Sequence, residues 1–201
     1  MTTFLAHLRR SFVLAIVAIV VFGFIYAFAG TGVAQLLFKY QADGSIGPNG
    51  SMLIGQNWTS NAWFHGRPDD TGPYAANAKE HISGGDNPLV ANGVSGESGA
   101  TNLGPRSKVL LADTKALVAY WHARGVNPTP DLVTTSGSGY DPDITAADAI
   151  AEIPMVAKAT GIAPDRLKTL IASVNQSEQF GFLGSSFIDV LQLNQGLAKL
   201  K

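Results

Sequence analysis

The stretch that decides the fold is FVLAIVAIVVFGFIYAFAGTGVAQLLF, residues 12–38, in which 27 consecutive residues carry no charged side chain. An α-helix rises about 1.5 Å per residue, so roughly 20 apolar residues cross the hydrocarbon layer of a bilayer. The stretch is long enough to span a membrane even if its end loosens around Gly30 and Gly32. It therefore predicts a single transmembrane anchor over residues 12–38.

The charges on either side of this stretch predict its orientation. Residues 1–39 contain three basic residues and no acidic one, whereas the rest of the chain contains 11 basic and 15 acidic residues. Basic residues next to a span tend to stay in the cytoplasm. We therefore expect a short cytoplasmic N-terminus over residues 1–11, a polar hinge over residues 39–50, and an extracytoplasmic domain over residues 51–201.

A cleaved signal peptide is the main alternative. It requires a basic start, an apolar core of about 7–15 residues and a cleavage site between small residues. Ala27-Phe28-Ala29 supplies such a site, but the uncharged run continues well beyond it to Phe38. The length of the run favours an uncleaved anchor, and under either interpretation the bulk of the chain lies outside the cytoplasm.

Composition excludes several classes of protein. The chain has no cysteine, which rules out disulfides, iron–sulfur clusters and thiolate zinc sites. Its net charge of −1 argues against a nucleic-acid partner, because phosphate binding requires a basic face. The roughly 150 residues beyond the hinge are enough for one domain with its own core.

The pattern of apolar and turn residues in this domain is typical of an α+β fold with a small sheet. A long Gly-, Asn- and Ser-rich loop is expected over residues 83–105. The expected strands cover residues 52–54, 131–135 and 187–191. The expected helices cover residues 109–124, 146–153 (capped by Thr145 and broken or kinked at Pro154), 156–160 (ending at Gly161), 164–174 and 193–200.

Motifs of common enzymes are missing. There is no phosphate-binding P-loop and no dinucleotide fingerprint, and the serine loop at residues 136–139 lacks the glycines that flank a nucleophile elbow. Asp141-Pro142-Asp143 has no glycine or glutamate where a calcium loop needs them, so we expect Asp143 or Thr145 to cap a helix instead. We expect no metal site. The histidines beyond the anchor do not have the spacing of zinc ligands and are expected on the surface: His65, His81 and His122. The aromatic residues near the start of the domain are expected in the core or on a partner surface: Trp58, Trp63, Phe64 and Tyr74.

Six blocks in order resemble the C subunit of the Kdp potassium-transporting P-type ATPase, and they extend over nearly the whole chain. They are GSMLIGQ (50–56), WFHGRP (63–68), SGATNLGP (98–105), VTTSGSGYDP (133–142), PMVAKA (154–159) and VLQLN (190–194). The chain departs from the family pattern at a few positions. Glu152 stands where the family carries a glutamine, and Asp189 stands where it carries an asparagine.

The resemblance implies an accessory, non-catalytic subunit of a bacterial or archaeal pump in the plasma (inner) membrane. Its implied partners are a channel-like subunit that selects potassium, a P-type subunit that hydrolyses ATP, and a small membrane peptide. ATP and potassium would be used by the complex, with no cofactor held by this chain. The family role is described as chaperone-like, raising the ATP affinity of the hydrolysing subunit, and it makes Glu152 a candidate nucleotide-binding position.

The expected topology favours a mechanism from outside. ATP is cytoplasmic, whereas the domain is expected outside, so we expect the anchor to pack against the channel-like subunit and the domain to cover its outer mouth. Candidate partner contacts are Phe12, Phe22, Phe24, Gln56, Arg67, Asn102, Ser136, Ser138 and Asp141. Two other hypotheses remain open at this point. They are an anchored extracytoplasmic hydrolase that uses Ser136 or Ser138 with His65 or His122, and a cleaved, soluble binding protein.

Overall fold

The structure, a computed structural model, describes residues 2–47, 49–56, 58, 60–68, 102–138 and 141–201. The chain divides into two units, Met1–Ile46 and Gly47–Lys201. The division lies within the expected hinge. Most of the expected 83–105 loop, together with Tyr74 and His81, lies outside the described residues.

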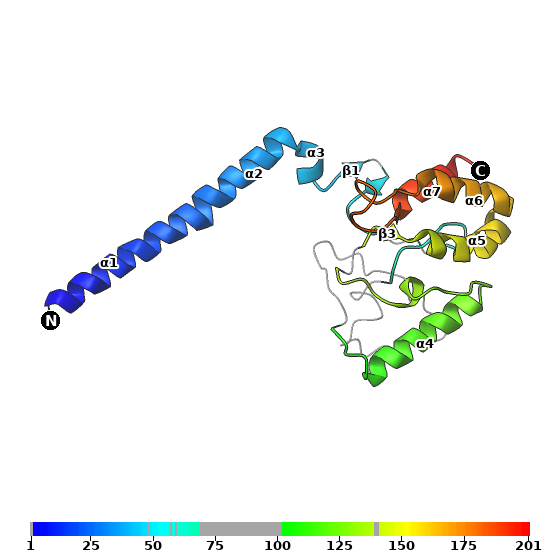
Figure 1. Cartoon of the computed structure of the whole chain (residues 1–201), viewed down its shortest axis with the longest axis horizontal. Helices are drawn as coiled ribbons and strands as arrows, with labels where there is room; N and C mark the ends of the chain where they lie inside the picture. Colours follow the sequence, from blue (N-terminus) through cyan, green and yellow to red (C-terminus); the bar gives the residue numbers. More distant parts are fainter. Residues whose placement is uncertain (1, 48, 57, 59, 69–101, 139–140) are drawn as a thin grey trace. The chain divides into compact units, whose positions relative to one another are not determined.

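The first unit is a long apolar helix. It consists of α1 (Thr2–Ala18), a π-helical segment (Ile19–Ile25) and α2 (Tyr26–Leu37), which Figure 1 draws as one continuous rod, and a short turn of helix, α3 (Lys39–Ala42), follows. Over the described residues, one helix, Thr3–Leu37, is long and apolar enough to cross a membrane, and none of its most apolar window is buried. The helix therefore covers nearly all of the predicted anchor and also extends towards the N-terminus through Arg9 and Arg10.

Over its described residues, the second unit packs four α-helices and short paired strands around one core. The helices are α4 (Lys108–His122), α5 (Ala146–Thr160), α6 (Pro164–Val174) and α7 (Val190–Ala198). Strands β1 (Ile46–Gly47) and β2 (Gly50–Ser51) form one two-stranded sheet, and β3 (Asp143–Ile144) pairs antiparallel with β4 (Ile188–Asp189) in another. Helices α5, α6 and α7 lie side by side (Figure 1), and the largest buried side chains are Trp121, Phe64, Leu117, Leu132, Leu167 and Ile188. The α+β prediction with a small sheet is confirmed.

Helix α5 runs without a break through Pro154, so the prediction of two separate helices, 146–153 and 156–160, is wrong. Its start is fixed by a capping box in which Thr145 accepts from the Asp148 N–H and Asp148 accepts from the Thr145 N–H. Its end is at Gly161, whose φ of 75° is the left-handed conformation that glycine adopts at low cost. Pro154 and Ile150, the residue whose carbonyl loses its hydrogen bond, are both exposed, so water can satisfy that carbonyl.

Two predicted strands are absent because side-chain hydrogen bonds to the backbone replace the hydrogen bonds that a sheet would form. In the segment 52–54, the Leu53 N–H donates to the Ser51 hydroxyl at 3.0 Å, which forms a turn instead of a ladder. In the segment 131–135, residues Asp131–Val133 form a 3₁₀ turn, and the Thr134 hydroxyl donates to the Pro130 carbonyl at 2.9 Å. The buried Trp121 indole N–H donates to the Leu132 carbonyl at 2.9 Å and holds this turn against the core.

The third predicted strand, 187–191, is shorter in the structure. Only Ile188–Asp189 pairs with β3, because the Asp189 carboxylate accepts the Gln192 N–H at 2.7 Å and starts α7 at Val190. The C-terminal helix consequently begins three residues earlier than predicted. The predicted helices at 109–124 and 164–174 are confirmed within two residues at each end.

Candidate functional site

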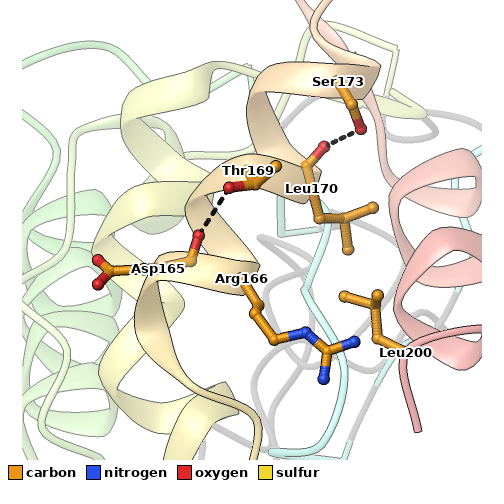
Figure 2. Close-up of a pocket in the computed structure, with 6 residues that line it drawn as sticks. All are labelled: Asp165, Arg166, Thr169, Leu170, Ser173 and Leu200. Atoms are coloured by element: carbon orange, nitrogen blue, oxygen red, sulfur yellow. Dashed lines mark hydrogen bonds between the residues drawn. The ribbon is translucent and has the colours of Figure 1, made fainter.

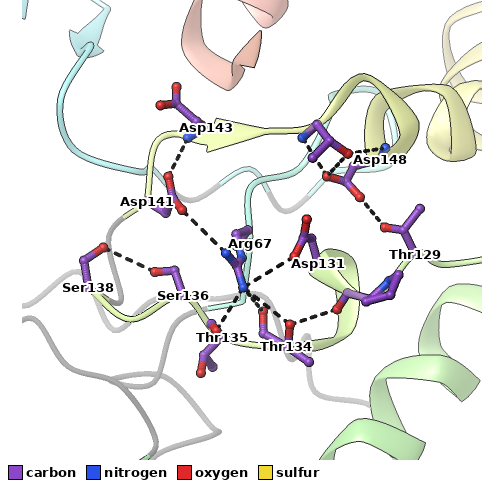
Figure 3. A network of polar contacts seen from close by, with 12 residues as sticks. Arg67, Thr129, Asp131, Thr134, Thr135, Ser136, Ser138, Asp141, Asp143 and Asp148 are labelled. Carbon is purple, nitrogen blue, oxygen red and sulfur yellow. Dashed lines mark hydrogen bonds and ion pairs between the residues drawn. The ribbon is translucent and has the colours of Figure 1, made fainter. Parts of the chain in front are cut away.

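Four of the predicted partner-contact residues, Arg67, Ser136, Ser138 and Asp141, lie in one polar cluster. The cluster, hereafter the Arg67 cluster, consists of Arg67, Asp131, Thr134, Thr135, Ser136, Ser138 and Asp141 (Figure 3). The Arg67 guanidinium donates to the Thr135 carbonyl at 3.1 Å and to the Thr134 hydroxyl at 3.4 Å. Its nitrogens lie 3.6 Å from an Asp131 oxygen and 3.7 Å from an Asp141 oxygen. One side chain therefore ties the segment around residue 67 to residues 131–141, about 70 positions later in the sequence.

The serines of the cluster form no catalytic pair with the two histidines proposed for them. The Ser136 and Ser138 hydroxyls lie 3.2 Å apart and share a hydrogen bond. The His65 ring binds Glu152, and His122 is an exposed residue in the last turn of α4. The glycine-rich loop thus presents hydroxyls beside a cation, which suits recognition of polar groups better than nucleophilic attack.

His65 and Glu152 form a buried pair, so the predicted surface position of His65 is wrong. The His65 Nδ1 lies 2.6 Å from a Glu152 carboxylate oxygen, and the His65 backbone N–H donates to both oxygens, at 3.1 and 3.2 Å. The two side chains are 1% and 0% exposed. The imidazole stands edge-on to Trp121, with ring centroids 5.3 Å apart.

Burial and the contacts with His65 change the pKa of Glu152 in opposite directions. Loss of hydration raises the pKa of Glu152, and the His65 ring and its N–H groups oppose the rise. Both Glu152 oxygens are buried and hydrogen-bonded to His65. The His65–Glu152 pair therefore has a structural role, because it connects α5 to the segment that leads to Arg67.

Asn194 holds the neighbouring residue of the same segment. Its side-chain carbonyl accepts from the Phe64 N–H at 2.9 Å, and its amide donates to the Phe64 carbonyl at 2.9 Å. The Asn194 side chain thus forms the two hydrogen bonds with the Phe64 backbone that a neighbouring β-strand would form. Together, Asn194 and Glu152 fix residues 64 and 65, and through them the point from which Arg67 reaches its cluster.

Sequence reasoning missed the buried pair although a local signal for it exists. Positions 149, 152, 153 and 156 share one face of a helix, and three of them are apolar. A glutamate on an apolar stripe requires a buried partner. The sequence around Glu152 could not identify that partner, because His65 lies 87 positions away.

The remaining predicted contact residues lie elsewhere. Phe12, Phe22 and Phe24 are 66%, 71% and 53% exposed on the apolar helix. The Gln56 amide donates to the Ser51 carbonyl at 3.0 Å, and Asn102 is an exposed residue with a φ of 52° in the segment that precedes α4.

Asp143 and Asp189 face each other across β3 and β4. They are direct register partners, and like charges in this position destabilise a sheet. Burial, then Asp141 and Asp189, raise the pKa of Asp143 to about 6. Burial also raises the pKa of Asp189, against the N–H groups of Gln192 and Leu191, which lower it.

This pair makes stability depend on pH. Between the ordinary pKa of 3.8 and the folded value of about 6, the folded chain binds more protons at Asp143 than the unfolded chain does. The free energy of unfolding therefore falls as the pH rises through this window. We expect Asp143→Asn to raise it by roughly 1 kcal/mol near pH 7.5, after allowance for solvent screening, and to change it little near pH 4. Urea unfolding at both pH values measures this, with the exposed Glu178→Gln as control, and an equal gain at both would contradict it.

The structure also has shallow surface hollows. The hollow shown in Figure 2, of about 400 Å³, lies along α6, and in it Arg166 and Leu200 point toward each other. Two of its hydroxyls are occupied locally, since the Thr169 hydroxyl donates to the Asp165 carbonyl and the Ser173 hydroxyl donates to the Leu170 carbonyl. Within the described part of the chain, no group of three or more His, Cys, Asp or Glu side chains is placed to hold a metal ion.

Comparison with known proteins gives a consistent result. The family model described as "K+-transporting ATPase, c chain" matches residues 8–199. A potassium-transporting ATPase KdpC subunit of Methylobacterium nodulans is 39% identical, with 98% of each chain covered. The corresponding subunit of a Rhodopseudomonas palustris strain is 39% identical over 96% of each chain, and KdpC subunit 1 of a Nostoc species is 38% identical over 96% of this chain and 94% of its own.

Proposed function

The chain belongs to the KdpC family, the C chains of K+-transporting ATPases, and on that premise we propose that it is an accessory, non-catalytic subunit of an ATP-driven potassium uptake complex. The observation that carries this proposal is the exposed helix Thr3–Leu37, joined to a unit whose polar clusters hold the fold together. Such a chain is built to be held in a membrane and to contact other subunits. The serine-hydrolase alternative has no support from the comparisons or from the contacts of the described serines.

The helix supplies the contact within the membrane. At about 1.5 Å per residue its 35 residues extend roughly 50 Å, more than the hydrocarbon layer of about 30 Å. We expect it to span the plasma (inner) membrane once, with Phe12, Phe22 and Phe24 facing lipid or the channel-like subunit. Arg9 and Arg10 keep its first residues in the cytoplasm.

The second unit then lies outside and contacts the outer part of the pump. The Arg67 cluster is the candidate contact there, because a partly exposed guanidinium beside carboxylates and hydroxyls suits a polar partner surface. The other candidates, Gln56 and Asn102, extend this proposal along the same unit. The expected partners are the channel-like subunit, the ATP-hydrolysing subunit and the small membrane peptide.

Any effect on ATP affinity is proposed to be indirect. Glu152, the position that the family motif suggested, is fully buried and bound to His65, which leaves no carboxylate oxygen for a nucleotide or its metal ion. The chain would act by holding the hydrolysing subunit in an assembled, active complex. ATP and potassium are then used by the complex, and this chain holds no cofactor of its own.

Deletion and co-purification test this function. We expect a strain that lacks the chain to lose growth and potassium uptake at limiting potassium, and the full-length chain to restore both. From membranes in mild detergent, the chain should co-purify with the other subunits of the transporter. A chain that purifies alone, from a strain whose uptake does not depend on it, would contradict the proposal.

A further inference from the structure

The segment between α6 and α7 is a hairpin rooted in the core. Gln176 pairs with Phe187 through two backbone hydrogen bonds of 2.8 and 3.1 Å, and Gln179 pairs with Leu183 through two of 3.0 and 2.9 Å. The next residue after this hairpin, Ile188, is fully buried. The base of the hairpin is thus anchored, and its two antiparallel bridges define the path of the backbone.

The tip of this hairpin presents apolar side chains to solvent. Phe180, Phe182 and Leu183 are 86%, 74% and 47% exposed, and every residue from 175 to 185 is exposed. These side chains contribute little to the core, so the fold does not explain them. Adjacent exposed apolar side chains on a structured loop mark a binding surface.

The backbone holds the tip in one shape. Phe180 and the two glycines of the tip, Gly181 and Gly184, have φ values of 54°, 77° and 81°, in the left-handed region. A phenylalanine rarely adopts this conformation, because its Cβ crowds the following carbonyl oxygen. Strain of this kind persists when the surrounding structure fixes it and a function uses it. A preset aromatic tip binds with little further loss of conformational freedom.

The charge around the tip indicates what it binds. From residue 169 to residue 198 the chain contains no Lys or Arg, and the charged residue next to the tip is Glu178. Attraction between basic residues and anionic lipid strengthens the binding of apolar segments to a membrane surface, and this stretch supplies no Lys or Arg for it. An apolar pocket on a protein with a basic residue at its rim suits both the apolar side chains of the tip and the negative charge of Glu178.

We propose that Phe180 and Phe182 insert into an apolar, basic-rimmed pocket on another subunit of the transporter. This proposal rests on the proposed function, because it takes its partner from the same complex. Aromatic side chains that fill a pocket dominate the affinity of protein interfaces. The hairpin is then a docking element that acts separately from the apolar helix and from the Arg67 cluster.

The test uses the full-length chain in its complex. The tagged transporter is purified with wild-type chain, with Phe180→Ser/Phe182→Ser, or with Leu111→Ser, a matched loss of a 56% exposed apolar side chain on α4. We expect the double variant to be retained at least about ten-fold less after dilution, and Leu111→Ser to be retained like wild type. Glu178→Lys should weaken retention as well. Thermal unfolding unchanged by Phe180→Ser/Phe182→Ser shows that the loss is not a folding defect.

A photo-crosslinking residue at position 182 identifies the occupant. A covalent product with another subunit of the transporter supports the proposal. A product with a second copy of this chain, a product with lipid only, or no product overturns it. Retention of the double variant equal to wild type also overturns it, while the proposed function stands. If wild-type chain itself is not retained, the proposed function fails first.

Discussion

Glu152→Ala is expected to destabilise the domain by about 3–5 kcal/mol, a far larger effect than that of Asp143→Asn. The change removes the acceptor of the His65 backbone N–H and the hydrogen-bond partner of the His65 ring Nδ1, and both side chains are enclosed. The buried His65 backbone N–H and ring then lose this partner, and a buried polar group without a hydrogen bond lowers stability. Urea unfolding of the detergent-solubilised chain measures the change.

Glu152→Gln is the matched control. A glutamine, which the family resemblance leads one to expect at this position, keeps an acceptor for the His65 N–H at nearly the same place. We expect it to cost less than about 1.5 kcal/mol. If Glu152→Ala lowered the free energy of unfolding no more than Glu152→Gln does, the His65–Glu152 pair would not be what fixes the segment before Arg67.

The elements that could be predicted from sequence are those set by local chemistry. The apolar run at 12–38, the helical spacing at 109–124 and 164–174, and the stop at Gly161 each depend on neighbours within a few residues. The α+β class followed from them. The wrong strand predictions share a cause, because Ser51 and Thr134 bind nearby backbone groups and replace ladder hydrogen bonds.

The sequence analysis identified individual residues of the site but not the contacts between them. Four of the predicted contacts, Arg67, Ser136, Ser138 and Asp141, were identified from family motifs, and their meeting depends on contacts across about 70 positions. The His65–Glu152 pair was missed for the same reason. The exposed hairpin tip with Phe180 and Phe182 was missed because exposure is not visible in an apolar sequence pattern.

The second large effect is an all-or-none difference in chemical accessibility. The chain has no native cysteine, so a single introduced cysteine reports its own location. Ser173 is an exposed residue near the end of α6, and Thr3 is an exposed residue at the start of the apolar helix. Because the basic residues Arg9 and Arg10 are expected on the cytoplasmic side of the span, the two positions should lie on opposite sides of the membrane.

Labelling of these two cysteines with a membrane-impermeant maleimide tests the central claim, that one helix holds this domain against the outer side of a potassium pump. In intact spheroplasts, Ser173→Cys should react fully, and Thr3→Cys should react only after the membrane is permeabilised. A Ser173→Cys chain that reacts only after permeabilisation would place the domain in the cytoplasm and contradict the account.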